Sequence, residues 1–426
     1  MTDDKRMTPG EADLALERSM RDLSLGMGML TGVAVAYGNR SHAASRIVGL
    51  RREVTAGPDG FRTSPLPITQ NTVFDLASLT KLFTLLCVLK LMERGKLRPG
   101  DAIADVDTRF RHLGDCPVMD CLGYRASLRT PQRVDAQESR ADALAMVFQT
   151  RRVPLEGERV YSDMNALVLK HVVETAAGLP FYDAVREMVL QPAGMRETWA
   201  RVPEQRRADL MDYNYEHKVL DGRYVMETSG LPGLPHDPKA RILSGQGDDL
   251  QGHAGLFSTM GDMCLLAQAL LSGDIIPKET LLSIGENRTG YLKEDGGYRQ
   301  FLGLLCFSKS PVARLSEVPG WMGQRAFALA GYTGNHLAID PDLGVFDLVL
   351  GNRCHNRVST ILPKESAASY GLAPGGEGTV DWPDGRRVKS SFQYVYRKDD
   401  MLHTPAAACL RARGWMEGPG VGRAGA

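Results

Sequence analysis

The chain has 426 residues and carries 51 basic and 51 acidic side chains, so its formal net charge is zero. This length can bury a sizeable core, and we expect two subdomains. Balanced charge argues against recruitment of nucleic acid or of an anionic membrane, so the expected partner is a small molecule. The oligomeric state cannot be predicted from the sequence.

The seven cysteines are scattered, odd in number and mostly set among apolar neighbours. This usage favours reduced thiols of a cytoplasmic protein over a disulfide framework. Cys116 and Cys121 could form half a zinc site, but no second pair accompanies them, and buried or loop thiols are favoured. We therefore expect no metal and no cofactor. Residues 1–6 are charged and lack the features of a signal peptide, and no apolar run reaches membrane-spanning length, which predicts a cytoplasmic protein without membrane contact.

The first hundred residues predict a helix, a strand pair and a second helix. Residues 10–25 have an amphipathic helical pattern, and the apolar run 32–38 predicts a buried strand with 45–54 as its antiparallel partner. A polar connection over 56–72 leads to a helix that begins at or just before Ser78 and ends at Gly95. This order favours an α/β arrangement in which the second helix packs behind a sheet.

Residues 99–235 predict a mainly helical insertion. Ser139 and Asp142 form a capping box before one helix, Asp163 precedes a second helix that ends at Gly178, and a third covers 181–190.

Strand patterns return after residue 300. The short β-prone runs 325–331, 336–340 and 345–351 predict an antiparallel meander. We therefore expect residues 1–98 and 236–360 to form one α/β subdomain, 99–235 the helical insertion and 361–426 a C-terminal extension. In that extension a Gly/Pro-rich linker begins at Leu362, a hairpin is predicted within 380–396, and residues 418–426 are expected to be disordered.

Ser78 and Lys81 are three residues apart, so their side chains leave the same face of the first helical turn. A serine needs a base to become a strong nucleophile, and a lysine can be that base if burial or neighbours destabilise its ammonium. Lys81 shares its face with Leu85, Val88 and Met92, which predicts burial. The helix N-terminus at Ser78 can also stabilise an oxyanion. Serine is equally a common N-cap, however, and Ser-x-x-Lys is a loose pattern.

Tyr161 stands just before a predicted helix, in the sequence Val-Tyr-Ser-Asp-Met-Asn. A tyrosine there can carry its phenol into a cleft, where a lysine cation lowers its pKa and lets it relay a proton. The alternative is an aromatic side chain packed over a helix N-terminus that Asp163 caps.

Four segments occur in a characteristic order: 74–81 (Phe-Asp-Leu-Ala-Ser-Leu-Thr-Lys), 161–165 (Tyr-Ser-Asp-Met-Asn), 252–259 (Gly-His-Ala-Gly-Leu-Phe-Ser-Thr), and 331–334 (Gly-Tyr-Thr-Gly) followed by Ile-Asp-Pro at 339–341. This succession resembles the serine β-lactamase-related family, which includes penicillin-binding DD-peptidases, class C β-lactamases, family VIII esterases and some acyltransferases. The similarity covers about residues 32–353. It implies an α/β (α+β) fold of the β-lactamase/transpeptidase type, with an antiparallel sheet flanked by helices.

The resemblance also implies roles for individual residues. Ser78 would attack a carbonyl and carry the acyl group, Lys81 would take or hold its proton, and Tyr161 would relay a proton to the leaving group. The backbone N–H groups of Ser78 and Tyr332 would form the oxyanion hole. Further candidates for substrate binding are Asp163, Asn165, Leu329, Gly331, His236 and His253.

Two positions depart from the family pattern. The third motif is usually Lys-Thr-Gly or His-Thr-Gly, whereas the register that keeps the spacing to Asp340 gives Leu329-Ala330-Gly331 here. The other register, Tyr-Thr-Gly at 332–334, changes that spacing, and we prefer the first. Asp163 stands where Asn is commoner, and its carboxylate would disfavour anionic substrates and raise the pKa of a nearby lysine. Both departures argue against a β-lactam or D-Ala-D-Ala target.

The hypothesis is a serine hydrolase that cleaves a small ester or amide through an acyl-enzyme on Ser78. The alternatives are acyl transfer to an acceptor other than water, and a degenerate relative that binds a ligand without turnover. For His253 we favour a structural bond to a turn over a substrate contact, while His236 lies in a long loop that could cover the cleft.

Overall fold

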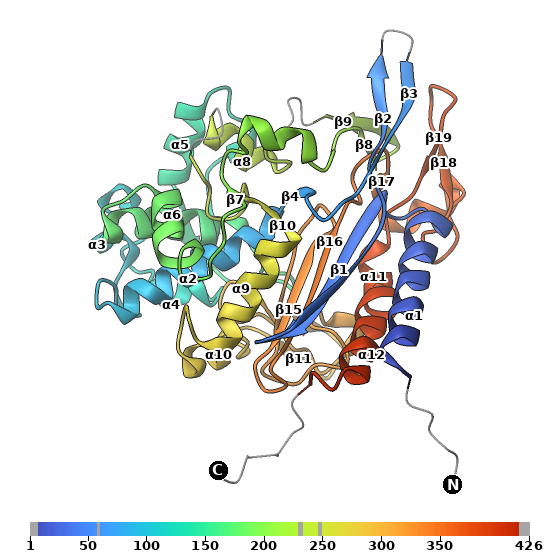
Figure 1. The fold of residues 1–426 in the computed structure, drawn as a ribbon. Coiled ribbons are helices and arrows are strands. Elements are labelled where there is room, and N and C mark those ends of the chain that lie inside the picture. Colours follow the sequence, from blue (N-terminus) through green and yellow to red (C-terminus); the bar gives the residue numbers. More distant parts are fainter. Residues whose placement is uncertain (1–6, 58–59, 229–232, 246–248, 417–426) are drawn as a thin grey trace, which may run out of the picture.

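The computed structural model describes residues 7–57, 60–228, 233–245 and 249–416. Its centre is a seven-stranded sheet in the order β13-β14-β15-β16-β1-β2-β3, in which every pairing is antiparallel. The strands are β1 (Gly32–Asn39), β2 (Ala43–Gly57), β3 (Gly60–Pro67), β13 (Phe307–Ser308), β14 (Phe327–Ala330), β15 (His336–Asp340) and β16 (Val345–Gly351). Since β1 pairs with β16, the predicted sheet split across the chain is confirmed (Figure 1).

The connection predicted over 56–72 is wrong in part, because residues 60–67 form β3. The strand pairs with β2, with Ala56 opposite Phe61. β3 is mostly exposed and lies at the edge of the sheet. An edge strand tolerates Pro65 and Pro67, because their missing N–H groups leave no hydrogen bond in the sheet unmade. These prolines made the segment look like a connection in the sequence.

The two faces of β1 pack against different helices. Val33 and Val35 belong to a core shared with α1 and α12, whereas Ala34 and Ala36 belong to the core of α2, α6 and α9. Figure 1 accordingly shows α1 and α12 side by side on one face of the sheet and α9 on the other. These helices are α1 (Pro9–Arg21), α2 (Thr80–Glu93), α6 (Asp163–Ala177), α9 (Met260–Ser272) and α12 (Thr404–Ala412).

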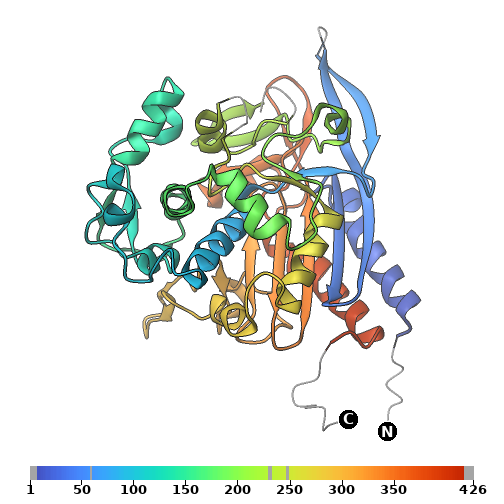
Figure 2. The same ribbon diagram turned by 60° about the vertical axis from the view of Figure 1, so that its left-hand side comes forward.

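The helix of the serine motif is confirmed with close bounds. A 3-10 turn over Ala77–Leu79 leads into α2, and Gly95 beyond its end has a left-handed φ of 67°. Figure 2 shows α2 between the sheet and the helices that follow it in the chain. The predicted helices of the middle third are also present, as α5 (Arg140–Phe148), α6 and α7 (Phe181–Val185), with a π-helical turn over Arg186–Leu190 after the last.

The middle third is nevertheless not purely helical. β8 (Glu216–Leu220) and β9 (Arg223–Glu227) form a hairpin there, and β8 also pairs with β17 (Val358–Leu362). Asp221 and Gly222 connect the two strands with φ values of 51° and 77°. An Asp-Gly pair is a typical signal of a two-residue hairpin, but this hairpin was not predicted from the sequence.

The C-terminal extension contains the predicted hairpin, as β18 (Thr379–Asp381) and β19 (Arg387–Lys389). It also contains α11 (Tyr394–Lys398) and α12, which were not predicted. The buried face of α12 includes Ala406 and Cys409, which pack against α1. Such small side chains give no clear apolar pattern in the sequence. Residues 418–426, predicted to be disordered, lie outside the described residues.

Shorter elements complete the fold. They are α3 (Ile103–Val106), α4 (Val118–Leu122), α8 (Pro238–Ser244), α10 (Lys278–Ile284), β4 (Val73–Asp75), β5 (Ser127–Arg129), β6 (Arg151–Val153), β7 (Thr198–Trp199), β10 (Phe257–Thr259), β11 (Tyr291–Leu292) and β12 (Tyr298–Arg299). None of the helices in the described part of the chain combines the length and apolar character needed to cross a bilayer. All seven cysteines are free thiols, and six of them are buried.

Candidate active site

Ser78 lies in the 3-10 turn that precedes α2. Ala77 before it has a φ of 46°, a conformation that non-glycine residues seldom adopt. Asp75 stabilises this turn, because its Oδ1 accepts a hydrogen bond of 2.8 Å from the Ala77 N–H. Backbone strain of this kind persists only where the surrounding structure holds it. The turn places the Ser78 hydroxyl at the N-terminal end of the helix.

Lys81 is completely buried and its ammonium lies against Ser78. Nζ donates to Ser78 Oγ at 2.8 Å, to the His253 carbonyl oxygen at 3.2 Å and to Asp163 Oδ1 at 2.9 Å. These three acceptors match the three N–H donors of an ammonium. The structure thus brings together the serine and lysine that the sequence singled out.

The charges around Lys81 decide its protonation. Burial by itself lowers the pKa of Lys81, but the Asp163 carboxylate and the Tyr161 phenol outweigh it, and the pKa lies above its ordinary value. Burial would likewise raise the pKa of Asp163, yet Lys81, His253 and Lys239 hold it well below its usual range. The resting pair is therefore an ammonium and a carboxylate. The predicted effect of Asp163 on the pKa of the lysine has the sign expected.

Tyr161 lies in the loop before α6, with its ring stacked on that of Phe307 at 5.3 Å between centroids and an interplanar angle of 5°. Lys81 Nζ is 4.9 Å from the centroid of the Tyr161 ring. The predicted alternative, in which Asp163 caps α6, is wrong. Ser162 is the cap and accepts from the Met164 N–H at 3.2 Å, which leaves the Asp163 carboxylate for the lysines.

The third motif lies against the catalytic turn. A Cβ atom on Gly331 would come 3.0 Å from the Leu76 carbonyl oxygen. Thr333 Oγ1 and Asn335 Nδ2 donate to the Asp75 carbonyl oxygen at 3.2 Å and 2.7 Å. These contacts bring the backbone of residues 331–332 to the turn that carries Ser78, as an oxyanion hole formed by Ser78 and Tyr332 requires.

Leu329 was predicted to bind substrate, but its side chain lies in the protein core. Its side chain is 3% exposed and belongs to the main apolar core, because it lies on a β14 face that packs inward. It therefore presents no surface to a ligand. The cationic or imidazole group missing at this position must come from elsewhere if the site is to contain one.

Asn165 and His253 are also fully buried. Asn165 Nδ2 donates to the carbonyl oxygens of Cys121 at 2.8 Å and Ala126 at 3.2 Å, which ties α6 to the preceding loop. His253 Nε2 lies 2.9 Å from Asp237 Oδ1, and its carbonyl accepts from Lys81. Neither side chain faces a ligand, and both hold the segments that carry the site residues.

His236 supports Tyr332 from the other side. Its ring stacks on the Tyr332 ring at 5.7 Å, and Nε2 lies 3.1 Å from Glu216 Oε2. The Tyr332 hydroxyl donates to Glu216 Oε1 at 2.7 Å. The His236 backbone N–H donates to Asp75 Oδ2 at 2.7 Å, so this group is joined to the Ser78 turn.

Lys239 is the residue that sequence reasoning missed. It lies in α8, which Asp237 caps, and its Nζ is 2.8 Å from Asp163 Oδ2 and 4.0 Å from Asp237 Oδ2. Asp163 thus joins two lysines from different parts of the chain. No sequence spacing connects residues 163 and 239. The only signal for Lys239 was its position three residues after His236, a predicted site residue.

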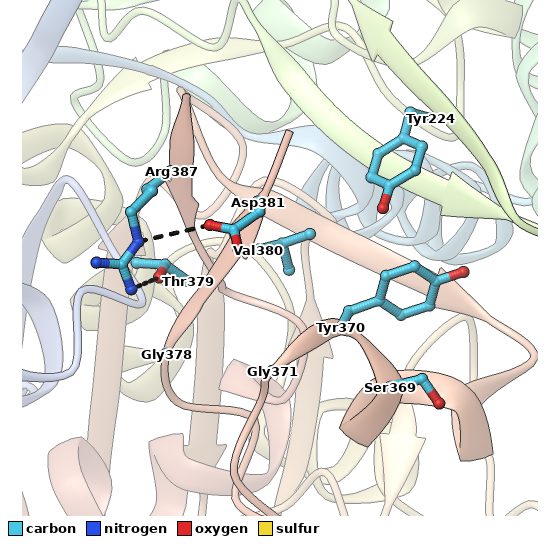
Figure 3. A pocket seen from close by; sticks show the side chains of 9 residues that line it. All are labelled: Tyr224, Ser369, Tyr370, Gly371, Gly378, Thr379, Val380, Asp381 and Arg387. Carbon is cyan, nitrogen blue, oxygen red and sulfur yellow. Dashed lines mark hydrogen bonds and ion pairs between the residues drawn. The ribbon is translucent and has the colours of Figure 1, made fainter. Parts of the chain in front are cut away.

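A cavity of about 580 Å³ opens beside this group, lined by residues 128–135, 161–164 and Lys239. Small-molecule sites commonly have this size. A cavity of about 670 Å³ lies elsewhere, where β9 meets β18, β19 and the turn over Lys364–Tyr370. Figure 3 shows its two tyrosines, Tyr224 and Tyr370, and the Arg387–Asp381 pair. None of the predicted catalytic residues lines the second cavity.

Two groups of metal-ligating side chains converge in the described part of the chain. They are Asp163, Asp237 and His253, and Glu216, His236 and Cys354, each with donor atoms within 4.8 Å of one another. Sequence spacing could not show either group. Lys81 and Lys239 already neutralise the first, and Lys218 Nζ lies 3.3 Å from Glu216 in the second. Ammonium groups occupy the places where a cation would bind, and we assign no metal.

A family model described as Beta-lactamase matches residues 26–369, which is most of the chain and includes all four motif segments. The chain belongs to the Beta-lactamase family. This confirms the resemblance drawn from the motifs.

Known proteins agree with this family assignment. A protein of Escherichia coli strain K12, provisionally named a D-alanyl-D-alanine carboxypeptidase, is 28% identical over 332 residues, which are 69% of this chain and 72% of that protein. EstCE1, described as a hydrolase with promiscuous acyltransferase activity, has a TM-score of 0.59 at 19% identity. A class C beta lactamase from Rhodobacter sphaeroides has a TM-score of 0.57 at 18% identity. Each alignment covers 80% of this chain and 94% of the solved structure, and the predicted β-lactamase-type fold is confirmed.

Proposed function

We propose that this protein is a serine hydrolase that cleaves an ester or amide bond of a small molecule through an acyl-enzyme on Ser78. The observation that carries the proposal is the 2.8 Å contact between the buried Lys81 Nζ and Ser78 Oγ. Membership of the Beta-lactamase family and the neighbouring Tyr161 support it.

The reaction begins from the minority of molecules in which Lys81 has lost its proton. Ser78 Oγ attacks the carbonyl carbon while its proton passes to the Lys81 amine. The backbone N–H groups of Ser78 and Tyr332 stabilise the oxyanion. The proton then passes through the Tyr161 phenol to the leaving oxygen or nitrogen as its bond to the acyl carbon breaks. Water attacks the acyl-enzyme, gives up a proton by the reverse route and releases the acid.

Acyl transfer is the second candidate. It differs only in the acceptor, because an alcohol or amine replaces water in the last step. EstCE1, a hydrolase with promiscuous acyltransferase activity, has the same fold, and this favours keeping transfer as a candidate. Product analysis with and without added alcohols and amines separates transfer from hydrolysis.

The test of the nucleophile is covalent labelling with an active-site fluorophosphonate, followed by intact-mass and peptide analysis. We expect one adduct, on the peptide that contains Ser78, and none in the S78A variant. S369A is the matched control, because Ser369 lines the remote cavity of Figure 3, and it should be labelled like the unmodified protein. Undiminished labelling of S78A refutes the proposal. A folded protein that neither the phosphonate nor any ester or amide modifies at Ser78 would support the alternative of a relative that binds a ligand without turnover.

A further inference from the structure

We propose that Lys239 is a positioning residue for the general base Lys81: its ammonium holds the Asp163 carboxylate and balances that charge whenever Lys81 is a neutral amine. The inference rests on the proposed function, in which Lys81 accepts the proton of Ser78. It gives Lys239 a part in forming the neutral base and none in binding the substrate.

Residues from α2, α6, α8 with its cap, and the segment 252–259 form a closed ring of contacts around the base. Lys81 Nζ lies 2.9 Å from Asp163 Oδ1, and the other Asp163 oxygen lies 2.8 Å from Lys239 Nζ. Lys239 Nζ is 4.0 Å from Asp237 Oδ2, and Asp237 Oδ1 is 2.9 Å from His253 Nε2. The His253 carbonyl oxygen accepts from Lys81 Nζ at 3.2 Å and closes the ring. Lys239 is therefore joined to the base on both sides of the ring.

The acceptors around Lys81 suit the neutral amine as well as the ammonium. The three N–H donors of the ammonium reach Asp163, the His253 carbonyl oxygen and Ser78 Oγ. After loss of one proton, the amine has two N–H donors and a lone pair. When Asp163 and the His253 carbonyl oxygen hold the two donors, the lone pair faces Ser78 Oγ, as proton transfer requires. This arrangement needs Asp163 to stay in place and charged, and Lys239 holds its second oxygen.

The charge of Lys239 makes the neutral form of Lys81 easier to reach. While Lys81 is an ammonium, the two lysines of the ring oppose its two carboxylates. Loss of the Lys81 proton adds one negative charge to this balance, and without Lys239 the same step would start from a ring that is already one charge more negative. This difference of one charge holds for either protonation state of His253. An excess charge is unfavourable where water is excluded, and the Lys81 side chain is completely buried.

Lys239 itself remains an ammonium at neutral pH. Burial lowers the pKa of Lys239, but Asp163 and Asp237 outweigh this effect, and the pKa lies above its ordinary value. The side chain is 24% exposed, so it also keeps some contact with water. One carboxylate thus lies between a lysine that stays charged and a lysine that must lose its proton.

The other charged groups near Lys239 have partners of their own. They come from the 3-10 turn over Val134–Ala136 and from α5, the elements that pack against α8. The pairs are Asp135 with Arg133 at 2.5 Å and Arg140 with Asp249 at 2.7 Å. Arg129 lines the same cavity as Lys239, but it is exposed and its charge is screened. The positive charge that affects Lys81 through Asp163 is therefore that of Lys239.

The test is the rate at which a neutral fluorophosphonate modifies Ser78, followed by intact mass from neutral to alkaline pH. We expect K239Q to react about 10-fold more slowly than the unmodified protein at each pH, which corresponds to a displacement of the profile by about one pH unit. K239R keeps the positive charge and should follow the unmodified profile. K278Q makes the same replacement at an exposed lysine of α10 and should also follow it.

The comparison of glutamine with arginine separates the charge of Lys239 from a structural role. Glutamine keeps a hydrogen-bond donor for Asp163, so a purely structural Lys239 would leave the K239Q profile unchanged. A K239Q profile that coincides with the unmodified one overturns the inference. Equal losses in K239Q and K239R also overturn it, because they show a general distortion of the site.

Absence of modification at Ser78 in the unmodified protein counts against the proposed function instead. The effect of Lys239 on Lys81 is then measured by NMR in D163N protein with carbon-13 at the lysine Cε, where Lys81 is expected to titrate at lower pH. The Lys81 signal is assigned by its loss in D163N/K81M. D163N/K239Q should raise the titration midpoint of Lys81 by about one pH unit, because a nearby positive charge lowers the pKa of an ammonium. An unchanged midpoint overturns the inference.

Discussion

Replacing Asp163 by asparagine tests how the site controls its own base. Asp163 Oδ1 lies 2.9 Å from Lys81 Nζ, and the pair holds the pKa of Lys81 above its ordinary value. Asparagine keeps the size of the side chain and removes the charge. If Lys81 must be neutral to accept the Ser78 proton, D163N should make the neutral amine available at lower pH.

The size of the effect follows from the geometry. Two unit charges 2.9 Å apart attract by about 6 kcal/mol at an effective dielectric constant of about 20. Lys239 competes for the same carboxylate and the site relaxes around the change, so we take about half of this value. About 3 kcal/mol corresponds to a movement of about two pH units in the titration of Lys81.

The assay is the pH dependence of kcat/KM for a neutral ester. In the unmodified protein the rate should still rise with pH at the alkaline end of the stable range. D163N should reach its plateau about two pH units earlier, with a lower maximum because a weaker base accepts the proton. D135N is the control, since Asp135 pairs with Arg133 and not with Lys81. Coincident acid limbs in D163N and the unmodified protein would show that Asp163 does not govern the base.

Three further outcomes are expected. Y161F should lower kcat by about 10²- to 10⁴-fold with little change in KM, as for loss of a proton relay, and an unchanged kcat excludes that role. E216Q should lower the free energy of unfolding by about 3–5 kcal/mol, because it leaves the buried His236 without its carboxylate, whereas Lys218 keeps Glu227. The pKa of Glu216 is lowered from 4.5, so the stability that the charged carboxylate contributes is lost as pH falls below that value. The pKa of His236 is raised from 6.5, so the stability that the imidazolium contributes is lost as pH rises above that value. Urea unfolding should therefore show the largest difference between pH 4.5 and 6.5, and a flat difference contradicts the pairing. G252A should destabilise the protein by about 3 kcal/mol, because the added Cβ would lie 2.2 Å from the Ala166 carbonyl oxygen. G261A in α9 should stabilise the protein by about 0.5–1 kcal/mol, because its Cβ would meet nothing closer than 3.8 Å and alanine favours a helix over glycine. Similar melting temperatures for the two variants would refute the packing argument.

The sequence by itself determined the parts of this protein that depend on neighbours along the chain. Ser78 and Lys81 share a face because they are three residues apart, and alternation along β1 and the meander of β14, β15 and β16 follows from strand periodicity. The order of four motifs was enough to indicate the family that the comparison confirms.

Only the tertiary structure decided which charges surround the base. Asp163 could be recognised as a carboxylate near Lys81, but the second lysine comes from α8, and no local pattern specifies that Lys239 meets Asp163. The same holds for Leu329, which the motif placed at the site and the packing of β14 placed in the core. Such contacts join residues far apart in the chain, and they form only when sheet, insertion and loops have packed against one another.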